Sequence, residues 1–159
     1  MEHSSVRNEQ MRRIGVAWRE LRRGGAMAAL LAHLHGEGGD ALDLGQVDTL
    51  DLLAQQGAYR MSELAEVLRV DPSTATRAVD RLVQAGLAER RRSEEDARVV
   101  LVVLTPLGRR RHDALVERRR EAMGRILEDF DAADRDRLAE LLERLIAGVD
   151  RYVAARRAG

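Results

Sequence analysis

The segment DPSTATR, residues 71–77, lies at the centre of the stretch that decides the fold, residues 62–105. Asp71 is a strong N-cap, because its carboxylate can accept hydrogen bonds from the free amides of the first helical turn. Pro72 suits the first helical position, where a missing N–H has no consequence. The sequence therefore predicts that a helix begins here, and Gly86 is placed to end it in a left-handed conformation.

This helix has one apolar face and one polar face. The apolar residues follow the spacing i, i+3, i+4, i+7 and are Ala75, Ala78, Val79, Leu82 and Val83. The opposite face carries Ser73, Thr74, Thr76, Arg77, Asp80, Arg81 and Gln84. A shorter helix, capped by Ser62, is predicted to run to Leu68 just before it. This spacing is typical of a helix-turn-helix, which presents its second helix to the major groove of DNA.

The residues after Gly86 predict a β-hairpin. Residues 87–92 and 99–104 flank a charged tip, and the second run is β-branched and short. A hairpin directly after a recognition helix forms a wing, whose arginines can reach phosphates or the minor groove. Arg90, Arg91 and Arg92 alternate faces on a strand, so at most two of them can face DNA together.

The whole stretch SELAEVLRVDPSTATRAVDRLVQAGLAERRRSEEDARVVLVVLTPLGR, residues 62–109, resembles the MarR family of winged helix-turn-helix regulators. Asp96-x-Arg98, ahead of a strand that ends at Leu104-Thr105, is similar to the family's wing signature. The resemblance implies a homodimer that binds a pseudo-palindromic operator, most often as a repressor. It also implies control by a small, often aromatic or anionic, effector bound between the winged domain and the dimer helices. Gly24-Gly25 and the glycine-rich residues 36–39 depart from the family's pattern.

Helices are predicted on the N-terminal side of this stretch. The first runs from about Val6 to Leu34, and Gly24-Gly25 predicts a kink or a break in it. Residues 36–40 form a loop by composition. Asp43-x-x-Gln46 is a capping box for a second helix that ends at Gly57, and residues 58–60 can pair with the wing as a short strand. The buried face of this second helix is predicted to hold Val47, Leu50, Leu53 and Ala54.

Two further helices follow the wing. Thr105-Pro106 repeats the cap-and-proline signal before a helix that runs to about Phe130, and Asp131 caps the last helix. The last helix carries apolar residues at heptad-like spacing: Leu138, Leu141, Leu142, Leu145, Val149, Tyr152 and Val153. A small winged domain does not need so many apolar residues, so the stripes at both ends of the chain indicate subunit contact.

The predicted fold is mostly α with a small β-hairpin. Residues 1–36 form an N-terminal dimerisation helix, residues 43–105 the winged helix-turn-helix DNA-binding domain, and residues 106–157 the C-terminal dimerisation helices. The length of 159 residues suits one domain with a sizeable core. With no secretory segment and no long apolar run, a cytoplasmic protein with no membrane partner is expected.

The charge pattern allows a DNA-binding face. The 27 basic residues, all arginine, equal the 27 acids, and a net charge of zero by itself argues against a nucleic-acid binder. The charges are segregated, however, because residues 69–120 hold 13 arginines and 8 acids, whereas residues 37–66 hold 7 acids and one arginine.

The expected DNA contacts come from the recognition helix and the wing. Arg77 is the best candidate to read a base, by a bidentate bond to guanine. Arg81 either reaches DNA or is held by Asp80 or another acid of the same domain, and Arg98 is expected both to pair with Asp96 and to enter a groove. The predicted DNA-binding residues are Ser73, Thr74, Thr76, Arg77, Arg81, Arg91 and Arg98.

No cofactor or metal is predicted. His33 and His35 lie on different sides of a helix and Glu37 in the adjacent loop, so a metal site would need ligands from elsewhere. Trp18 is expected to pack in the core or the dimer contact, with the wall of a ligand pocket as its second role. The absence of cysteine, of a phosphate-binding loop and of an interpretable catalytic arrangement argues against an enzyme. The alternative to a DNA-binding regulator is a dimeric helical module whose winged domain binds a protein.

Overall fold

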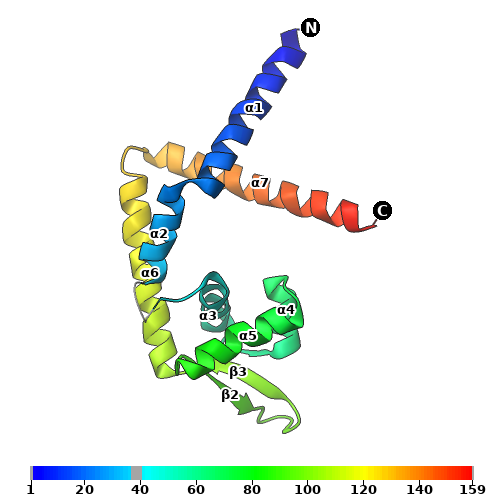
Figure 1. The fold of residues 1–159 in the computed structure, drawn as a ribbon, viewed down its shortest axis with the longest axis vertical. Coiled ribbons are helices and arrows are strands. Elements are labelled where there is room, and N and C mark those ends of the chain that lie inside the picture. Colours follow the sequence, from blue (N-terminus) through cyan, green and yellow to red (C-terminus); the bar gives the residue numbers. More distant parts are fainter. Residues whose placement is uncertain (1, 37–40, 159) are drawn as a thin grey trace. The chain divides into compact units, whose positions relative to one another are not determined.

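The computed structural model describes residues 2–36 and 41–158, which form a mostly helical fold with a small antiparallel sheet, as predicted (Figure 1). The chain divides into two compact units, residues 1–118 and 119–159. The predicted loop at 36–40 lies, apart from Gly36, outside the described residues. In chain order the elements are α1 (Glu2–Arg23), α2 (Gly25–His35), α3 (Leu44–Gln56), β1 (Ala58–Arg60), α4 (Met61–Leu68), α5 (Pro72–Gln84), β2 (Ala88–Arg92), β3 (Val100–Leu104), α6 (Pro106–Ile126) and α7 (Ala132–Ala158).

The sheet confirms the predicted hairpin and the predicted extra strand. Its order is β1-β3-β2, and both outer strands run antiparallel to β3. Val102, at the centre of β3, is opposite Tyr59 of β1 on one side and Arg90 of β2 on the other. The β2–β3 hairpin follows α5 directly and forms the wing (Figure 1).

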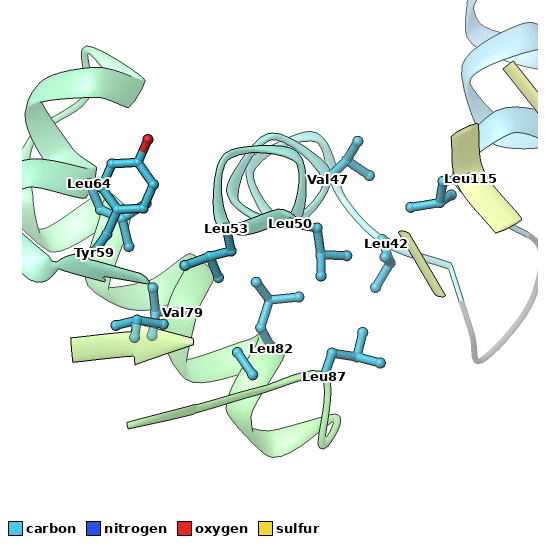
Figure 2. Packing of buried hydrophobic residues seen from close by; sticks show 12 residues of the cluster. Leu42, Val47, Leu50, Leu53, Tyr59, Leu64, Val79, Leu82, Leu87 and Leu115 are labelled. Carbon is cyan, nitrogen blue, oxygen red and sulfur yellow. The ribbon is translucent and has the colours of Figure 1, made fainter. Parts of the chain in front are cut away.

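The core of the first unit lies between α3, α4, α5 and the sheet. Figure 2 shows Leu50 and Leu53 of α3 beside Leu82 of α5, and all three side chains have no exposed surface. The predicted apolar face of α5 is confirmed, with Val83 only partly buried. The buried hydrophobic cluster comprises Leu42, Val47, Leu50, Leu53, Tyr59, Leu64, Val79, Leu82, Leu87, Ala88, Val102 and Leu115.

Most of the predicted helix ends are present. At α3, Asp43 Oδ1 accepts from the amide of Gln46 at 3.0 Å and Gln46 Oε1 accepts from the amide of Asp43 at 3.1 Å, which completes the capping box. Thr105 caps α6 by accepting from the amide of Gly108 at 3.0 Å. Asp131 caps α7 by accepting from the amide of Asp134 at 2.8 Å. These caps satisfy amides that no helical carbonyl can reach.

Two helix boundaries differ from the prediction. α4 begins at Met61, and Ser62 is inside the helix instead of capping it, because Glu63 reaches back to accept from the amide of Arg60 at 2.9 Å. α6 ends at Ile126 and not near Phe130. A tight turn follows, in which the amide of Phe130 donates to the carbonyl of Leu127 at 3.1 Å, and Asp131 then opens α7.

The predicted first helix is broken at Gly24. This residue has an extended conformation, with φ −64° and ψ 135°, and it separates α1 from α2. Its backbone lies so close to the previous turn that a Cβ would come within 2.7 Å of the carbonyl oxygen of Glu20, so glycine fits where a larger residue would clash. The described side chains of α1 are all exposed, including Trp18, so the apolar stripe of this helix has no cover within its own unit.

The start of α6 is packed closely against the turn that follows α5. A Cβ on Gly108 would lie 1.8 Å from the carbonyl oxygen of Leu87, so only glycine allows this approach. The hydroxyl of Thr105 donates to the carbonyl of Gly86 at 2.7 Å, and the amide of Thr105 donates to the carbonyl of Leu87 at 3.1 Å. The turn after α5 and the start of α6 are therefore joined by a backbone hydrogen bond and by the hydroxyl of Thr105.

Candidate nucleic-acid interface

The first turn of α5 is organised by Asp71. Its carboxylate accepts from the amide of Thr74 at 3.0 Å, from the hydroxyl of Thr74 at 2.6 Å and from the hydroxyl of Ser73. These hydrogen bonds favour the ionised carboxylate and hold the pKa of Asp71 well below its usual range, with Ser73 as the largest cause and Thr74 next. Asp71 is therefore the N-cap of α5, as predicted.

The hydroxyls of this face donate inward. Ser73 and Thr74 donate to Asp71, and Thr76 donates to the carbonyl of Pro72 at 2.8 Å. All three residues are exposed, and Ser73 Oγ also accepts from Nη2 of Arg77. To donate to a phosphate, each hydroxyl must rotate about its C–O bond and leave its present acceptor.

Arg77 is exposed and contacts neutral groups. Its Nη2 donates to Ser73 Oγ at 3.1 Å and its Nε donates to the carbonyl of Ser73 at 3.4 Å, both one turn earlier in α5. In residues 2–36 and 41–158 it has no carboxylate partner. Its positive charge is therefore not neutralised, which suits a side chain that approaches a polyanion.

Three other arginines near this face are paired with acids. Arg81 Nη2 lies 2.9 Å from Asp43 Oδ2, at the N-cap of α3. Of the alternatives for Arg81, the structure thus shows an acid of the same domain, although it is Asp43 and not Asp80.

Asp80 instead binds an arginine of the wing. Its Oδ1 lies 2.6 Å from Nη2 of Arg90 in β2, and Arg91 pairs with Glu89 on its own strand. This role of Arg90 was not predicted from the sequence, because the ten positions that separate it from Asp80 follow no helical or strand period. The only signal was an acid on α5 and an arginine run on the strand that follows.

The wing tip is ordered by Asp96, although in a different way from the prediction. Asp96 Oδ1 accepts from the backbone amide of Arg98 at 3.0 Å, and the carbonyl of Asp96 accepts from the amide of Val99 at 2.9 Å. The carboxylate therefore fixes the backbone of the tip and does not pair with the guanidinium, which corrects the expected Asp96–Arg98 ion pair. Among the described residues, the guanidinium groups of Arg98 and Arg92 have no acid partner.

The interface as a whole combines the outward face of α5 with the arginines of the wing. The Asp80–Arg90 contact places the two elements side by side. Uncompensated charge remains on Arg77 of α5 and on Arg92 and Arg98 of the wing, and Arg92 was not among the predicted residues. Such an arrangement can place one cation in a major groove while others approach the adjacent backbone.

Other parts of the chain hold no competing metal site among the described residues, where no cluster of three or more His, Cys, Asp or Glu side chains was found. Glu37, considered with His33 and His35, lies outside the described residues. No helix within the described ranges is long and apolar enough to cross a bilayer.

A cavity of about 300 Å³ in the first unit is lined by Ala41, Leu42, Gln46, Ala85, Leu87, Leu107 and Arg111.

The chain is similar to proteins of one family. The sequence model of the MarR family matches residues 42–100. The HTH-type transcriptional repressor MdtR of Bacillus subtilis (strain 168) is 34% identical over 82 residues, which are 52% of this chain and 53% of that protein. The uncharacterized HTH-type transcriptional regulator YdgJ of the same organism is 30% identical over 100 residues, which are 63% of this chain and 61% of that protein. The chain thus spans between half and two thirds of the length of these curated relatives.

A solved structure extends the similarity beyond the winged region. The crystal structure of a probable transcriptional regulator from Pseudomonas aeruginosa is 30% identical to this chain and has a TM-score of 0.67. The match covers 83% of this chain and 96% of that one, so it includes helices outside residues 42–100.

Proposed function

This chain belongs to the MarR family, and we propose that it is a transcriptional regulator that binds operator DNA as a homodimer and represses. The observation that carries the proposal is the exposed face of α5, where Arg77 stands without an acid partner behind a firmly capped first turn. α4 before it and the arginine-bearing wing after it complete the arrangement. The direction of regulation follows the relative MdtR, which is named a repressor.

Each predicted residue has a proposed role at the DNA. Arg77 reads a base edge in the major groove, by a bidentate contact to guanine. Ser73, Thr74 and Thr76 contact phosphates once their hydroxyls rotate from their present acceptors. Arg91 and Arg98 contact the backbone or the minor groove from the wing, and Arg81 contacts a phosphate from within its ion pair with Asp43.

The dimer is proposed from the terminal helices, residues 1–36 and 106–157, which flank the DNA-binding domain at residues 43–105. On α7 the apolar residues Leu141, Leu145 and Val149 are 43–49% exposed, and on α1 Ile14 and Trp18 are 53–55% exposed. Closed twofold dimers are the commonest way in which such stripes are covered. A twofold dimer would set two copies of α5 into successive major grooves, about 10 bp apart.

We propose, from family membership, that a small aromatic or anionic effector releases the DNA. The cavity beside the start of α6 supports such a ligand, since Leu87 and Leu107 offer apolar walls and Gln46 and Arg111 polar ends. Benzoate is a suitable probe. It should weaken operator binding by the wild-type chain, and Leu107→Trp, which narrows the cavity, should remove this response. An unchanged response in Leu107→Trp would place the effector elsewhere.

The proposal has one rival class, a dimeric module whose winged unit binds a protein. The known relatives are named regulators and not enzymes, which leaves DNA or protein as the partner. Titration of the full chain with DNA from upstream of its own gene, at several salt concentrations, separates the two. A regulator shows tight binding that falls linearly in log K against log salt and exceeds binding to unrelated DNA. Absence of salt-dependent DNA binding would favour the protein-binding module.

A further inference from the structure

Two consecutive residues of α5 connect the recognition helix to its neighbours on both sides. Asp80 contacts Arg90 of β2, with Oδ1 and Nη2 2.6 Å apart, and Arg81 contacts Asp43 at the N-cap of α3, with Nη2 and Oδ2 2.9 Å apart. Neighbouring residues on a helix point about 100° apart, so the two contacts hold α5 from two directions.

Both partners lie on ordered parts of the fold. Asp43 uses its other carboxylate oxygen to cap α3, where Oδ1 accepts from the amide of Gln46 at 3.0 Å. Arg81 therefore binds a carboxylate that is already fixed. Arg90 lies on β2, where it is paired with Val102 of β3, a fully buried residue of the core. Both contacts thus join α5 to ordered backbone and not to a free loop.

The Asp80–Arg90 ion pair is not explained by folding stability. The Asp80 and Arg90 side chains are 54% and 37% exposed, and exposed pairs contribute little to the stability of a fold. The negative charge of Asp80 should also disfavour DNA binding, because Asp80 lies on the proposed DNA-facing surface, one helical turn after Arg77. An acid there repels phosphates unless it does something that offsets the repulsion.

We propose that Asp80 is a positioning residue for DNA recognition: through Arg90 it sets the wing relative to α5, while Arg81 and Asp43 hold the other side of the helix. This inference rests on the proposed function. In this proposal Arg90 orients the wing relative to α5, Arg77 reads a base, and Arg98 contacts the DNA backbone or the minor groove. An acid that would weaken DNA binding by its charge alone then strengthens operator binding through geometry.

The sign of one substitution tests the proposal. Asp80→Asn in the full chain removes a negative charge and weakens the contact to Arg90. Simple electrostatics predicts tighter binding to every DNA, whereas positioning predicts operator affinity at least about fivefold weaker, within the range of coupled ion-pair networks. Glu94→Gln is the matched control, because it removes the same charge at the wing tip, where the described residues offer it no ion pair. The control should bind both DNAs as tightly as the wild type or more so.

A double-mutant cycle separates positioning from general damage. Asp80→Asn and Arg90→Gln should each weaken operator binding, and the double variant should lose no more than the worse single variant, because both remove the same contact. Asp80→Glu should recover most of the affinity. Thermal unfolding of all the variants should stay close to that of the wild type, since both residues are exposed.

The outcomes distinguish this proposal from the one on which it rests. If the wild type prefers operator DNA and Asp80→Asn behaves like Glu94→Gln, or if the cycle is additive, the positioning role is overturned and the regulator stands. If the wild type does not prefer any DNA, the proposed function itself fails and this inference fails with it.

Discussion

The winged region and the terminal helices carry apolar stripes of the same kind, but among the described residues only the stripes of the winged region are buried. Leu82 of α5 has no exposed surface, whereas Leu145 of α7 is 43% exposed and Trp18 of α1 is 53% exposed. The difference lies in what each helix meets. α5 packs against α3, α4 and β2 in its own unit. Figure 2 shows the first of these contacts, with Leu82 of α5 beside Leu50 and Leu53 of α3. Periodicity predicts that a face will be buried, but not by which chain.

The two regions therefore differ in what stabilises them. The winged unit buries its own core and holds α5 beside the wing, the two elements that we propose contact DNA. The terminal helices leave apolar area exposed that water disfavours by about 25 cal/mol for each Å². Burial against a second copy would recover that free energy. Stability of the winged unit should therefore be a property of the single chain, and assembly a property of α1 and α7.

The largest expected effect comes from deleting most of α7. Removal of residues 136–159 should abolish the dimer and lower operator affinity about 10²–10⁴-fold, because the two recognition helices would no longer bind as a linked pair. Sedimentation and a DNA titration measure the two effects. A finer test is Leu145→Arg, which places a charge on the stripe, with Glu143→Arg on another face of α7 as its control. A truncated chain that stays soluble and dimeric would place the interface elsewhere.

The next effect concerns the core of the winged unit. Leu82→Ala should lower the free energy of unfolding by about 2–5 kcal/mol, since it removes a fully buried side chain and leaves a cavity. Val67→Ala, at a residue of α4 that is 50% exposed, is the matched control and should change little. Urea unfolding followed by circular dichroism measures both. Equal losses in the two variants would mean that the core boundary is misplaced.

A smaller effect is expected at the reading residue. Arg77→Ala should lower operator affinity by about 1–3 kcal/mol, the value of one bidentate base contact, and should leave the dimer intact. Arg110→Ala, an exposed arginine of α6 with no assigned role, controls for the loss of charge. Binding constants for operator and unrelated DNA give the selectivity. A variant with wild-type affinity and preference would show that another residue reads the base.

The smallest effect is expected at the wing. Arg98→Ala should weaken operator and unrelated DNA together and lower the slope of log K against log salt by about 0.9, the contribution of one neutralised phosphate. Its role is electrostatic because its guanidinium is held by no acid among the described residues. Titrations at several salt concentrations give the slope. A loss of selectivity as large as that of Arg77→Ala would contradict the division between reading helix and anchoring wing.

Local signals predicted the winged fold well because its contacts are encoded nearby in the sequence. Asp71 and Asp43 each cap a helix whose first amides lie within three residues, and these caps are present as predicted. The run of Val and Leu at residues 100–104 forms the central strand, which its local composition predicts. Misjudged boundaries, such as the start of α4, arose where a competing side chain, Glu63, supplied the cap from inside the helix.

Contacts between distant side chains could not be predicted in the same way. The sequence left Arg81 open between DNA and an acid, and the acid proved to be Asp43, 38 positions away. The partner of Asp96 was predicted as a guanidinium and is an amide, because a two-residue turn brings the backbone of Arg98 within reach first. Which partner a charged side chain binds depends on tertiary distances and rotamers, and the periodicity of the sequence does not predict these.

A footprint on the DNA upstream of its own gene, combined with the stoichiometry of the complex, tests the central claim most directly: two winged units, joined by terminal helices, read one operator. We predict a protected pseudo-palindrome whose half-sites lie about 10 bp apart, bound by two chains at once. Protection without a repeated half-site, or one chain bound for each site, would contradict the account.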